Sequence, residues 1–458
     1  MPIMRNPLLI PDLRELIQAG ETGAVREFLD DLHPAQVAEM VEDLGEGEGD
    51  AVFELMEPRG RAEVLSYLRD DEQVRIVDKM SPGAAASLLH HMSHDERADL
   101  FKHLDEERVD LILPHLAQAE REDIRRLASY EPGTAGAVMT TDYATLPPHL
   151  TVRESLEKLR HESPDRETIY YIYVVDAERT LIGFVSLKSL ILARPLARIE
   201  SIMKREPLLA RVDEDQESVA RKIDKYDLIA IPVVDAAGML LGIVTHDDAM
   251  DILRQEQTED ILKFGGVSTD HEIDDIPYWQ GTVWRAVSRR LKWLVILFMT
   301  ESLTGWVLRH YAWVDERELR LHLWVPLLIG TGGNAGSQTV GTVIRGVALG
   351  EIRFRDTFAV LAREVATGFL LGLVLGAVGF LWAFVLRGEN VVFACVIALT
   401  ILGICMWANG VSALVPLAAQ RFGQDPAVIS APFISTLVDA TGLVIFYTIA
   451  IFLLNIVR

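Results

Sequence analysis

The hydrophobic pattern divides the chain into a mixed polar and apolar region and a region of long apolar runs. Residues 1–280 alternate short apolar segments with many charged residues. Residues 281–458 contain stretches long enough to cross about 30 Å of hydrocarbon as helices. The expected spans are residues 291–308, 321–349, 358–386, 391–419 and 428–457. The pattern therefore predicts a multi-domain membrane protein with a soluble N-terminal region and a five-helix transmembrane domain, residues 281–458.

An apolar residue recurs every 12 residues in the first part of the chain. A proline follows Leu32, Met56 and Met80 by two residues, where it suits the first turn of a new helix. A fixed period of this kind predicts short helices that are stable only when stacked. We expect an all-α, acidic helical-repeat N domain over residues 1–133. The repeated residues are Leu32, Leu44, Met56, Leu68, Met80, Met92, Leu104 and Leu116.

Residues 134–256 contain two copies of a longer unit. Each copy predicts a helix, two strands and a helix, with strands at 170–175 and 181–186 in the first copy and 229–234 and 240–245 in the second. This order resembles a tandem CBS pair, an α/β module that often senses adenine nucleotides or metal ions. We place copy one at 134–200 and copy two at 201–256.

A predicted helix follows the second copy without a linker. Ala249, Ile252 and Leu253 lie at helical spacing, and acidic residues occupy much of the remaining surface. We assign residues 246–280, which overlap the end of copy two, to a connecting helix and linker. Movement of the CBS pair would reach the first span through this helix.

Charge and cysteine content exclude several classes of protein. The net charge is −23, and because residues 281–458 hold 14 basic and 10 acidic residues, residues 1–280 carry −27. Such a surface attracts cations and repels nucleic acid, so we expect no nucleic-acid partner. The two cysteines, Cys395 and Cys405, exclude a disulfide scaffold and a zinc ribbon. No motif or constellation indicates an enzyme.

Basic residues predict the orientation in the membrane. An odd number of spans puts the two ends of the chain on opposite sides. With the N-terminus inside, nine Lys and Arg residues flank the inner ends of the spans and five flank the outer ends. The positive-inside rule therefore favours a multi-pass protein of the cell (inner) membrane with a cytosolic N-terminus.

The expected spans carry features typical of an ion path. Asp439 lies about 20 Å along the fifth span, where a charge must face water, a partner or an ion. Glycine-rich residues 330–338, Asn409-Gly410 with Pro416, and Pro432 predict interrupted helices lining a water-filled path. Carbonyl and carboxylate oxygens suit Mg²⁺ or Ca²⁺, and Mg²⁺ keeps much of its water shell. Glu301 is a further acid in apolar surroundings, and the sequence gives it no role.

Five spans make a thin pore wall, so a symmetric homodimer is the natural assembly. Two copies of Asp439 would then face one ion. The soluble acids suggest feedback, because Mg²⁺ bound between repelling carboxylates would pull the domains together.

Four segments together resemble a known family. Residues 326–338 (PLLIGTGGNAGSQ), 425–442 (DPAVISAPFISTLVDATG), the CBS pair and 258–265 (TEDILKFG) are similar to the MgtE magnesium channels and their eukaryotic relatives. The resemblance covers essentially the whole chain. It implies a homodimer in the lipid bilayer whose N domain and CBS pair close the pore when cytosolic Mg²⁺ is high, so that Mg²⁺ is both transported and regulatory.

The resemblance also implies site residues. Asp439 and Asn334 match the pore site, with the backbone carbonyl of Ala431, and Asp425 matches the cytosolic pore entrance. The implied regulatory metal ligands are Glu63, Asp95, Asp99, Asp215, Glu217, Asp227, Asp248, Asp251, Glu256, Glu259 and Asp260.

Two departures argue against ATP as a ligand of the CBS pair. Some members hold ribose with a carboxylate three residues after a strand-end Ser or Thr, and copy one has Ser189 there, after Ser186. Leu228 stands where an aromatic ring could stack on adenine.

Three alternatives remain open. One is a secondary transporter coupled to H⁺ or Na⁺, another is a membrane-anchored metal sensor, and the third is a preference for Mn²⁺ or Co²⁺.

Overall fold

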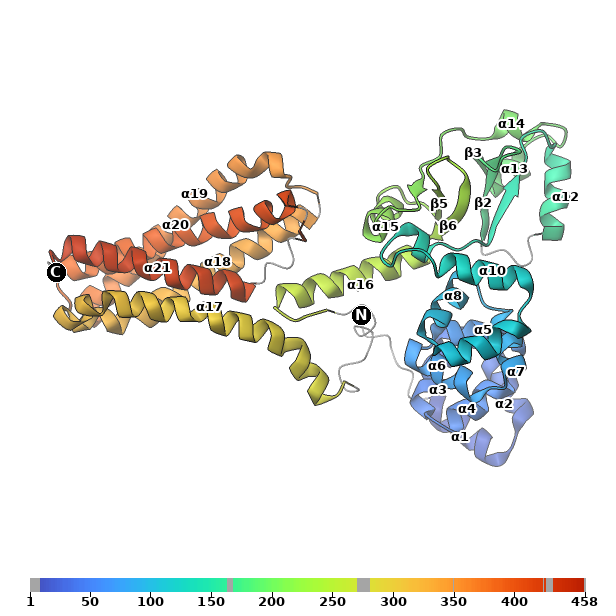
Figure 1. The fold of residues 1–458 in the computed structure, drawn as a ribbon, viewed down its shortest axis with the longest axis horizontal. Coiled ribbons are helices and arrows are strands. Elements are labelled where there is room, and N and C mark those ends of the chain that lie inside the picture. The colour runs from blue at the N-terminus through green and yellow to red at the C-terminus, as the bar shows by residue number, and fades with distance from the viewer. Residues whose placement is uncertain are drawn as a thin grey trace. The chain divides into compact units, whose positions relative to one another are not determined.

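The computed structural model confirms the predicted combination of a helical N domain, an α/β CBS pair and a set of apolar helices. It describes residues 9–162, 168–269, 281–348, 350–422, 424–425 and 431–456. The chain forms two compact units, residues 1–254 and 255–458, and each is described by itself (Figure 1).

The N domain is a stack of short helices, as the 12-residue period predicts. Pro34, Pro58 and Pro82 each occupy the first position of a helix. Four helices end at a recurring apolar residue, and these residues are Met56, Leu68, Met80 and Leu104. All four pack in or against a single hydrophobic core. The helices are α1 (Leu9–Ala19), α2 (Thr22–Asp30), α3 (Pro34–Leu44), α4 (Glu48–Leu55), α5 (Pro58–Tyr67), α6 (Asp70–Lys79), α7 (Pro82–Leu89), α8 (His94–His103), α9 (Glu106–Ile112), the 3₁₀ turn η1 (Leu113–His115) and α10 (Gln118–Leu127).

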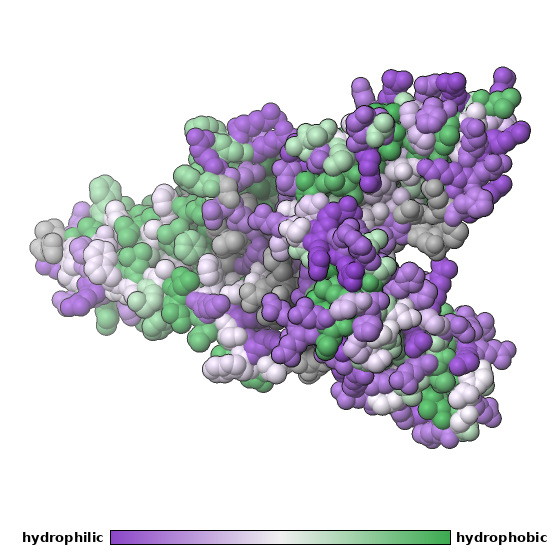
Figure 2. Space-filling model, turned by 45° about the vertical axis from the view of Figure 1, so that its right-hand side comes forward, coloured by the Kyte–Doolittle hydropathy of each residue, from purple (hydrophilic) through white to green (hydrophobic). Residues whose placement is uncertain are grey.

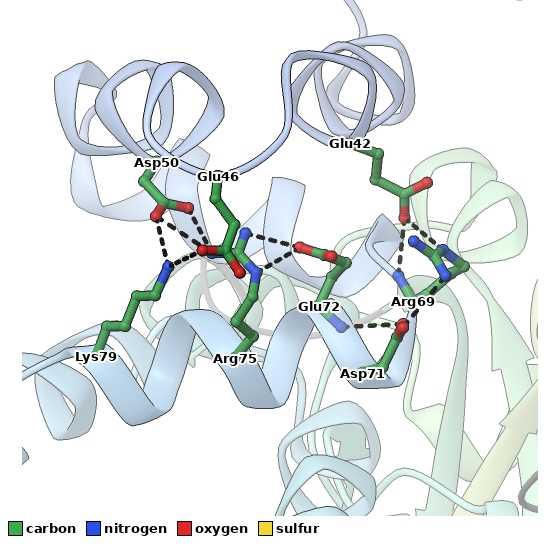
Figure 3. A network of polar contacts seen from close by, with 8 residues as sticks. All are labelled: Glu42, Glu46, Asp50, Arg69, Asp71, Glu72, Arg75 and Lys79. Atoms are coloured by element: carbon green, nitrogen blue, oxygen red, sulfur yellow. Dashed lines mark hydrogen bonds and ion pairs between the residues drawn. The ribbon is translucent and has the colours of Figure 1, made fainter. Parts of the chain in front are cut away.

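Many N-domain acids are neutralised locally. Helix α6 supplies Arg75 and Lys79, whose cationic groups lie 2.8 and 2.9 Å from Asp50 (Figure 3). Arg75 also pairs with Glu72 at 2.7 Å, and Arg69 with Glu42 at 3.1 Å. Burial alone would raise the pKa of Asp50, but Lys79 and Arg75 outweigh it and lower that pKa. These acids hold neighbouring repeats together.

Each CBS copy contains a three-stranded sheet. In both sheets a parallel pair is followed by an antiparallel pair, in the orders β1-β2-β3 and β4-β5-β6. The predicted strands are confirmed. The elements are α11 (Ala135–Val138), β1 (Tyr143–Leu146), α12 (Val152–Glu162), β2 (Thr168–Val175), β3 (Leu181–Ser186), α13 (Leu187–Leu192), α14 (Ile199–Ile202), β4 (Ala210–Arg211), α15 (Gln216–Lys225), β5 (Ala230–Val234) and β6 (Leu240–Thr245).

The segment before each copy crosses to the sheet of the other copy. Thr140, which precedes β1, pairs with Ile243 of β6, and Lys204, which precedes β4, pairs with Phe184 of β3. A glycine permits each crossing. A Cβ on Gly183 would lie 2.6 Å from the Lys204 carbonyl oxygen, and one on Gly242 would lie 2.7 Å from that of Thr140.

Helix α16 (His246–Phe264) follows β6 directly and crosses the boundary between the two units. Ala249 and Ile252 are buried in the core of CBS copy two. Phe264, at its other end, packs against a cluster of membrane-helix residues that includes Val340 and Ile434.

The second unit consists of long apolar helices. Four described helical stretches are long and apolar enough to cross a membrane, at Val283–Arg317, Phe354–Leu386, Val391–Arg421 and Ala431–Leu453. Their exposed surface is largely hydrophobic (green in Figure 2). The elements are α17 (Val283–Arg317), η2 (Leu319–Trp324), α18 (Val325–Ala348), η3 (Phe354–Asp356), α19 (Thr357–Leu381), the π-helical η4 (Trp382–Leu386), α20 (Val391–Arg421) and α21 (Ala431–Leu453).

The second expected span, residues 321–349, corresponds to α18, which packs on α20 and α21 but is less apolar because of its glycines and polar residues. Helix α17 is much longer than the expected 291–308. The predicted start of the last span, at 428, lies outside the described residues.

The predicted interruptions in α18 and α20 are wrong. Helix α18 continues through residues 330–338, and α20 continues through Asn409, Gly410 and Pro416. With its amide nitrogen toward α18, Asn409 donates to Thr339 Oγ1 (3.2 Å) and accepts from the Gly368 N–H of α19 (3.3 Å). The polar group therefore links three helices, and broken-helix carbonyls at these places are not available as ion ligands.

Glycines in this unit serve close helix packing. On α19, Gly368, Gly372 and Gly376 recur every four residues and face the α20 backbone. A Cβ on Gly372 would lie 2.7 Å from Leu402 Cα, well inside normal contact. Small residues at such spacing let membrane helices approach closely.

Candidate functional site

Asp439 lies between helices of the second unit, on α21. The side chain is half-buried, and a Cβ on Gly333 of α18 would lie 3.4 Å from its Oδ1. The buried Oδ1 has no hydrogen-bond partner among the described residues. An unsatisfied carboxylate oxygen at such a place is costly unless a ligand or water meets it.

Helix α18, whose Gly333 adjoins this carboxylate, also carries an exposed stripe. Gly330, Asn334, Gln338 and Thr342 recur every four residues and are all exposed in the single chain. They therefore lie on one face of the helix. Ser337, beside this stripe, donates to the Ala431 carbonyl at 3.5 Å, so that carbonyl is also next to α18.

Asp425 meets the end of α16. Its carboxylate lies 2.9 Å from Lys263 Nζ, which is also 2.7 Å from Glu259. Burial lowers the pKa of Lys263, but the two carboxylates outweigh this effect and raise it. Glu256, Glu259 and Asp260 are half-buried and, with Lys263, fall on one face of α16.

One group of acids in the first unit surrounds Tyr67. Burial raises the pKa of Tyr67, and Glu96, Asp247, Glu63 and Asp251 raise it further through their negative charge. These acids come from α5, α8 and the start of α16, so the N domain and the CBS pair both contribute. Glu63 also pairs with Arg59 (3.3 Å).

Asp248 adjoins the same group. Burial raises its pKa to about 6, with help from the charges of Asp247 and Glu96, although a 2.5 Å hydrogen bond from Thr245 Oγ1 opposes the shift. Part of the Asp248 population is therefore protonated near neutral pH. Sequence reasoning missed Glu96 and Asp247, and only their adjacency to Asp95 and Asp248 could have indicated them.

Asp95 and Asp99 are close to basic side chains of α8. Asp95 belongs to the acids that act on Arg97, whose guanidinium is almost fully buried and has its pKa lowered by burial. Asp99 forms a 2.6 Å ion pair with Lys102. The three predicted N-domain acids therefore have different charged neighbours, and Lys102, the partner of Asp99, also donates to the Ala137 carbonyl of CBS copy one.

A hydrogen-bonded group near Arg97 joins the N domain to CBS copy one. Asp123 of α10 lies 2.7 Å from His94 Nδ1 and accepts from Thr141 Oγ1 at 2.6 Å. Burial would raise the pKa of Asp123, but His94 and Thr141 outweigh it and lower that pKa to about 2. No sequence pattern indicated this contact, because its members are far apart along the chain.

Two of the three predicted acids of CBS copy two have local partners. Asp215 caps α15 by accepting from Ser218 N (2.9 Å), and Glu217 pairs with Arg221. Asp227 has a positive φ of 49° in the turn after α15. Across the described part of the chain, no three His, Cys, Asp or Glu residues are arranged to hold a metal ion.

One nucleotide-site departure is in copy one and the other is in copy two. Ser186 caps α13, and its Oγ lies 2.8 Å from Ser189 Oγ. Leu228 packs against the core of copy two.

Family models match three parts of the chain. The model described as a divalent cation transporter matches residues 325–449, the MgtE intracellular N domain matches 32–133, and the CBS domain matches 135–195 and 199–255.

Two magnesium transporters are similar to this chain over more than two thirds of its length. The magnesium transporter MgtE of Thermus thermophilus is 40% identical over 342 residues, which are 73% of this chain and 73% of that protein. The magnesium transporter MgtE of Enterococcus faecalis is 35% identical over 71% of this chain and 70% of that protein.

Two solved structures resemble the first part of the chain. The soluble part of a magnesium transporter is 33% identical with a TM-score of 0.51, and covers 54% of this chain and 97% of that one. The cytosolic domain of the Mg²⁺ channel MgtE in complex with ATP is 38% identical with a TM-score of 0.51, and covers 53% and 100%.

Proposed function

Because the chain belongs to the MgtE family of divalent cation transporters, we propose that it is a Mg²⁺ channel of the cell membrane, closed by Mg²⁺ bound on its cytosolic side. The family is one of transporters and not of enzymes, which agrees with the absence of catalytic motifs from the sequence. The proposal rests on the place of Asp439.

The Asp439 carboxylate suits a hydrated divalent cation. One of its oxygens has no described hydrogen-bond partner, and the exposed amides of Asn334 and Gln338 lie on the neighbouring helix α18. Mg²⁺ dehydrates reluctantly and prefers oxygen ligands, so water-mediated contacts to these groups would hold it. The Ala431 carbonyl adds one more oxygen beside α18.

The exposed stripe supports a homodimer. Amide groups facing lipid would be costly, and a second copy related by a two-fold axis would cover them and enclose a path. Each subunit would then contribute one Asp439 to that path.

The acids around Tyr67 and on α16 support closure by Mg²⁺. Two carboxylates about 6 Å apart repel by about 3 kcal/mol at an effective dielectric constant of 20, and a divalent cation between them removes this cost. Binding there would favour the arrangement that brings the acids together. Asp95, Asp99, Asp215, Glu217 and Asp227 remain candidates through rearrangement of their present partners.

Two further features belong to the proposal. The N-terminus and both soluble domains lie in the cytosol, as the basic flanks indicate. Copy one of the CBS pair lacks the ribose carboxylate, so we propose no ATP binding there, although one relative of known structure was solved with ATP.

The test is electrical recording from purified protein in bilayers, with cytosolic-side Mg²⁺ stepped from near zero to several millimolar. We expect a Mg²⁺ current that switches off on the step. Asp439→Ala should abolish the current, while Thr448→Ala, at an exposed position of the same helix, should not. Equal currents in both variants would refute the pore role of Asp439. A flux that requires a proton or Na⁺ gradient would replace the channel by a coupled transporter.

A further inference from the structure

Glu301 is the acid to which the sequence analysis assigned no role. It lies on α17, within a stretch of apolar residues, and its side chain is exposed in the single chain. No basic side chain pairs with it among the described residues. Acids placed within a membrane segment are rare and generally serve an ion path or a buried partner.

The packing of α17 on α21 places Glu301 at the level of Asp439. Higher along both helices, the rings of Tyr311 and Tyr447 stack with centroids 4.9 Å apart. The Tyr447 hydroxyl also donates to Asp315 at 2.9 Å. Glu301 precedes Tyr311 by ten residues on α17, and Asp439 precedes Tyr447 by eight residues on α21. At 1.5 Å per residue these distances are about 15 and 12 Å, so the two carboxylates differ in depth by only about 3 Å.

The helix phases agree with this placement. Glu301, Leu308 and Asp315 repeat every seven residues and therefore lie on one side of α17. Leu308 packs against the cluster that holds Tyr447, and Asp315 bonds to Tyr447 itself. Glu301 thus lies on the side of α17 that faces α21, and its charge acts on the Asp439 carboxylate.

We infer that Glu301 is a specificity-determining residue of the ion path, which favours divalent over monovalent cations at Asp439. This inference rests on the proposed transport function. The electrostatic free energy of a cation in the field of Glu301 is proportional to the cation's charge. Loss of that field therefore lowers both binding constants. The fold-loss for a divalent ion is the square of the fold-loss for a monovalent ion. A loss of about threefold for Na⁺ corresponds to about ninefold for Mg²⁺.

The experiment compares the permeability ratio of Mg²⁺ to Na⁺, from reversal potentials, in wild type, Glu301→Gln and Glu301→Asp. We expect a severalfold fall of the ratio in Glu301→Gln and substantial rescue in Glu301→Asp, which keeps the charge. Ser302→Ala, at the next exposed position of α17, should leave the ratio unchanged. If Glu301→Gln does not fold, Glu301→Ala supplies a second uncharged side chain.

The outcomes separate this inference from the proposed function. An unchanged ratio in Glu301→Gln, in a channel that Asp439→Ala abolishes, overturns the role of Glu301 and leaves the pore role of Asp439 intact. An equal fractional loss for Na⁺ and Mg²⁺ also overturns it, because a change of pore structure would affect both ions alike. Normal current in Asp439→Ala would instead refute the proposed function itself.

Discussion

Gly372→Ala tests whether the close approach of α19 and α20 determines the stability of the membrane unit. The added Cβ would lie 2.7 Å from Leu402 Cα, 3.0 Å from the Leu402 carbonyl oxygen and 3.1 Å from Leu402 Cδ1. Carbon atoms in contact normally stay about 3.5–4.0 Å apart, so the helices must separate by about 1 Å. Two of the three obstacles are backbone atoms, which no side-chain rotation can move.

The cost follows from overpacking. Extra methyl groups in a close-packed interior cost about 1–3 kcal/mol. Separation would also weaken the neighbouring contacts of Gly368 and Gly376, which lie one helical turn away on either side. We therefore expect Gly372→Ala to lower the free energy of unfolding by at least about 1–3 kcal/mol.

Gly305→Ala is the matched control. Gly305 also lies within a long helix of this unit, but a Cβ there would have no atom within 4 Å. This substitution should be neutral or should stabilise α17 by up to about 1 kcal/mol, because alanine is the better helix former.

The assay is equilibrium unfolding of both variants in mixed detergent micelles, followed by helical circular dichroism. A Gly372→Ala protein as stable as Gly305→Ala would show that the interface yields without cost, and the packing argument would then be wrong.

Three further predictions concern the candidate sites and the N domain. Gly333→Ala should reduce Mg²⁺ flux in liposomes at least tenfold without reducing yield, because its Cβ would collide with Ser435 Oγ and displace that side chain beside Asp439; unchanged flux would contradict this. Asp248→Asn should stabilise the first unit by about 1–3 kcal/mol in urea titrations near pH 7.5. Because the folded-state pKa of Asp248, about 6, lies above its ordinary value, folding favours the protonated form. The stabilisation by Asp248→Asn should therefore vanish as pH falls to 4, and a stabilisation independent of pH would refute this. Arg75→Gln should destabilise the N domain by about 1–2 kcal/mol at pH 7, and by progressively less as pH falls below the ordinary carboxyl pKa and through the lowered pKa of Asp50; a loss that does not change with pH would exclude the ion pairs as the cause.

The sequence predicted those parts of the fold that local periodicity determines. The 12-residue spacing located the helix ends at Met56, Leu68 and Met80, because a buried residue is needed once per stacked helix. The apolar and polar alternation located β2 and β3 and their counterparts β5 and β6.

The reading of α18 and α20 failed because it applied the helix propensities of water to a membrane. Lipid offers the backbone no competing hydrogen bonds, so a glycine-rich segment remains helical there, and glycine is retained for packing. Gly332 and Gly336 face Ile404, Val438 and Ser412 across such contacts.

The candidate sites could be predicted only in part. The resemblance supplied Asp439 and the acids of α16, but Glu96, Asp247 and the contact of His94 with Asp123 depend on which helices meet. No single-sequence pattern carries that information, because the partners are separated by tens to hundreds of residues.

The crossing of Thr140 and Lys204 between the CBS sheets bears on how this region can change during evolution. A duplication normally yields two modules that can be lost, replaced or shuffled one at a time. Here the first segment of each copy pairs with the sheet of the other copy. Gly183 and Gly242 leave the space that each crossing segment occupies. Deleting either copy would leave the survivor's sheet without its neighbour, so the pair should be inherited, exchanged and unfolded as one indivisible unit.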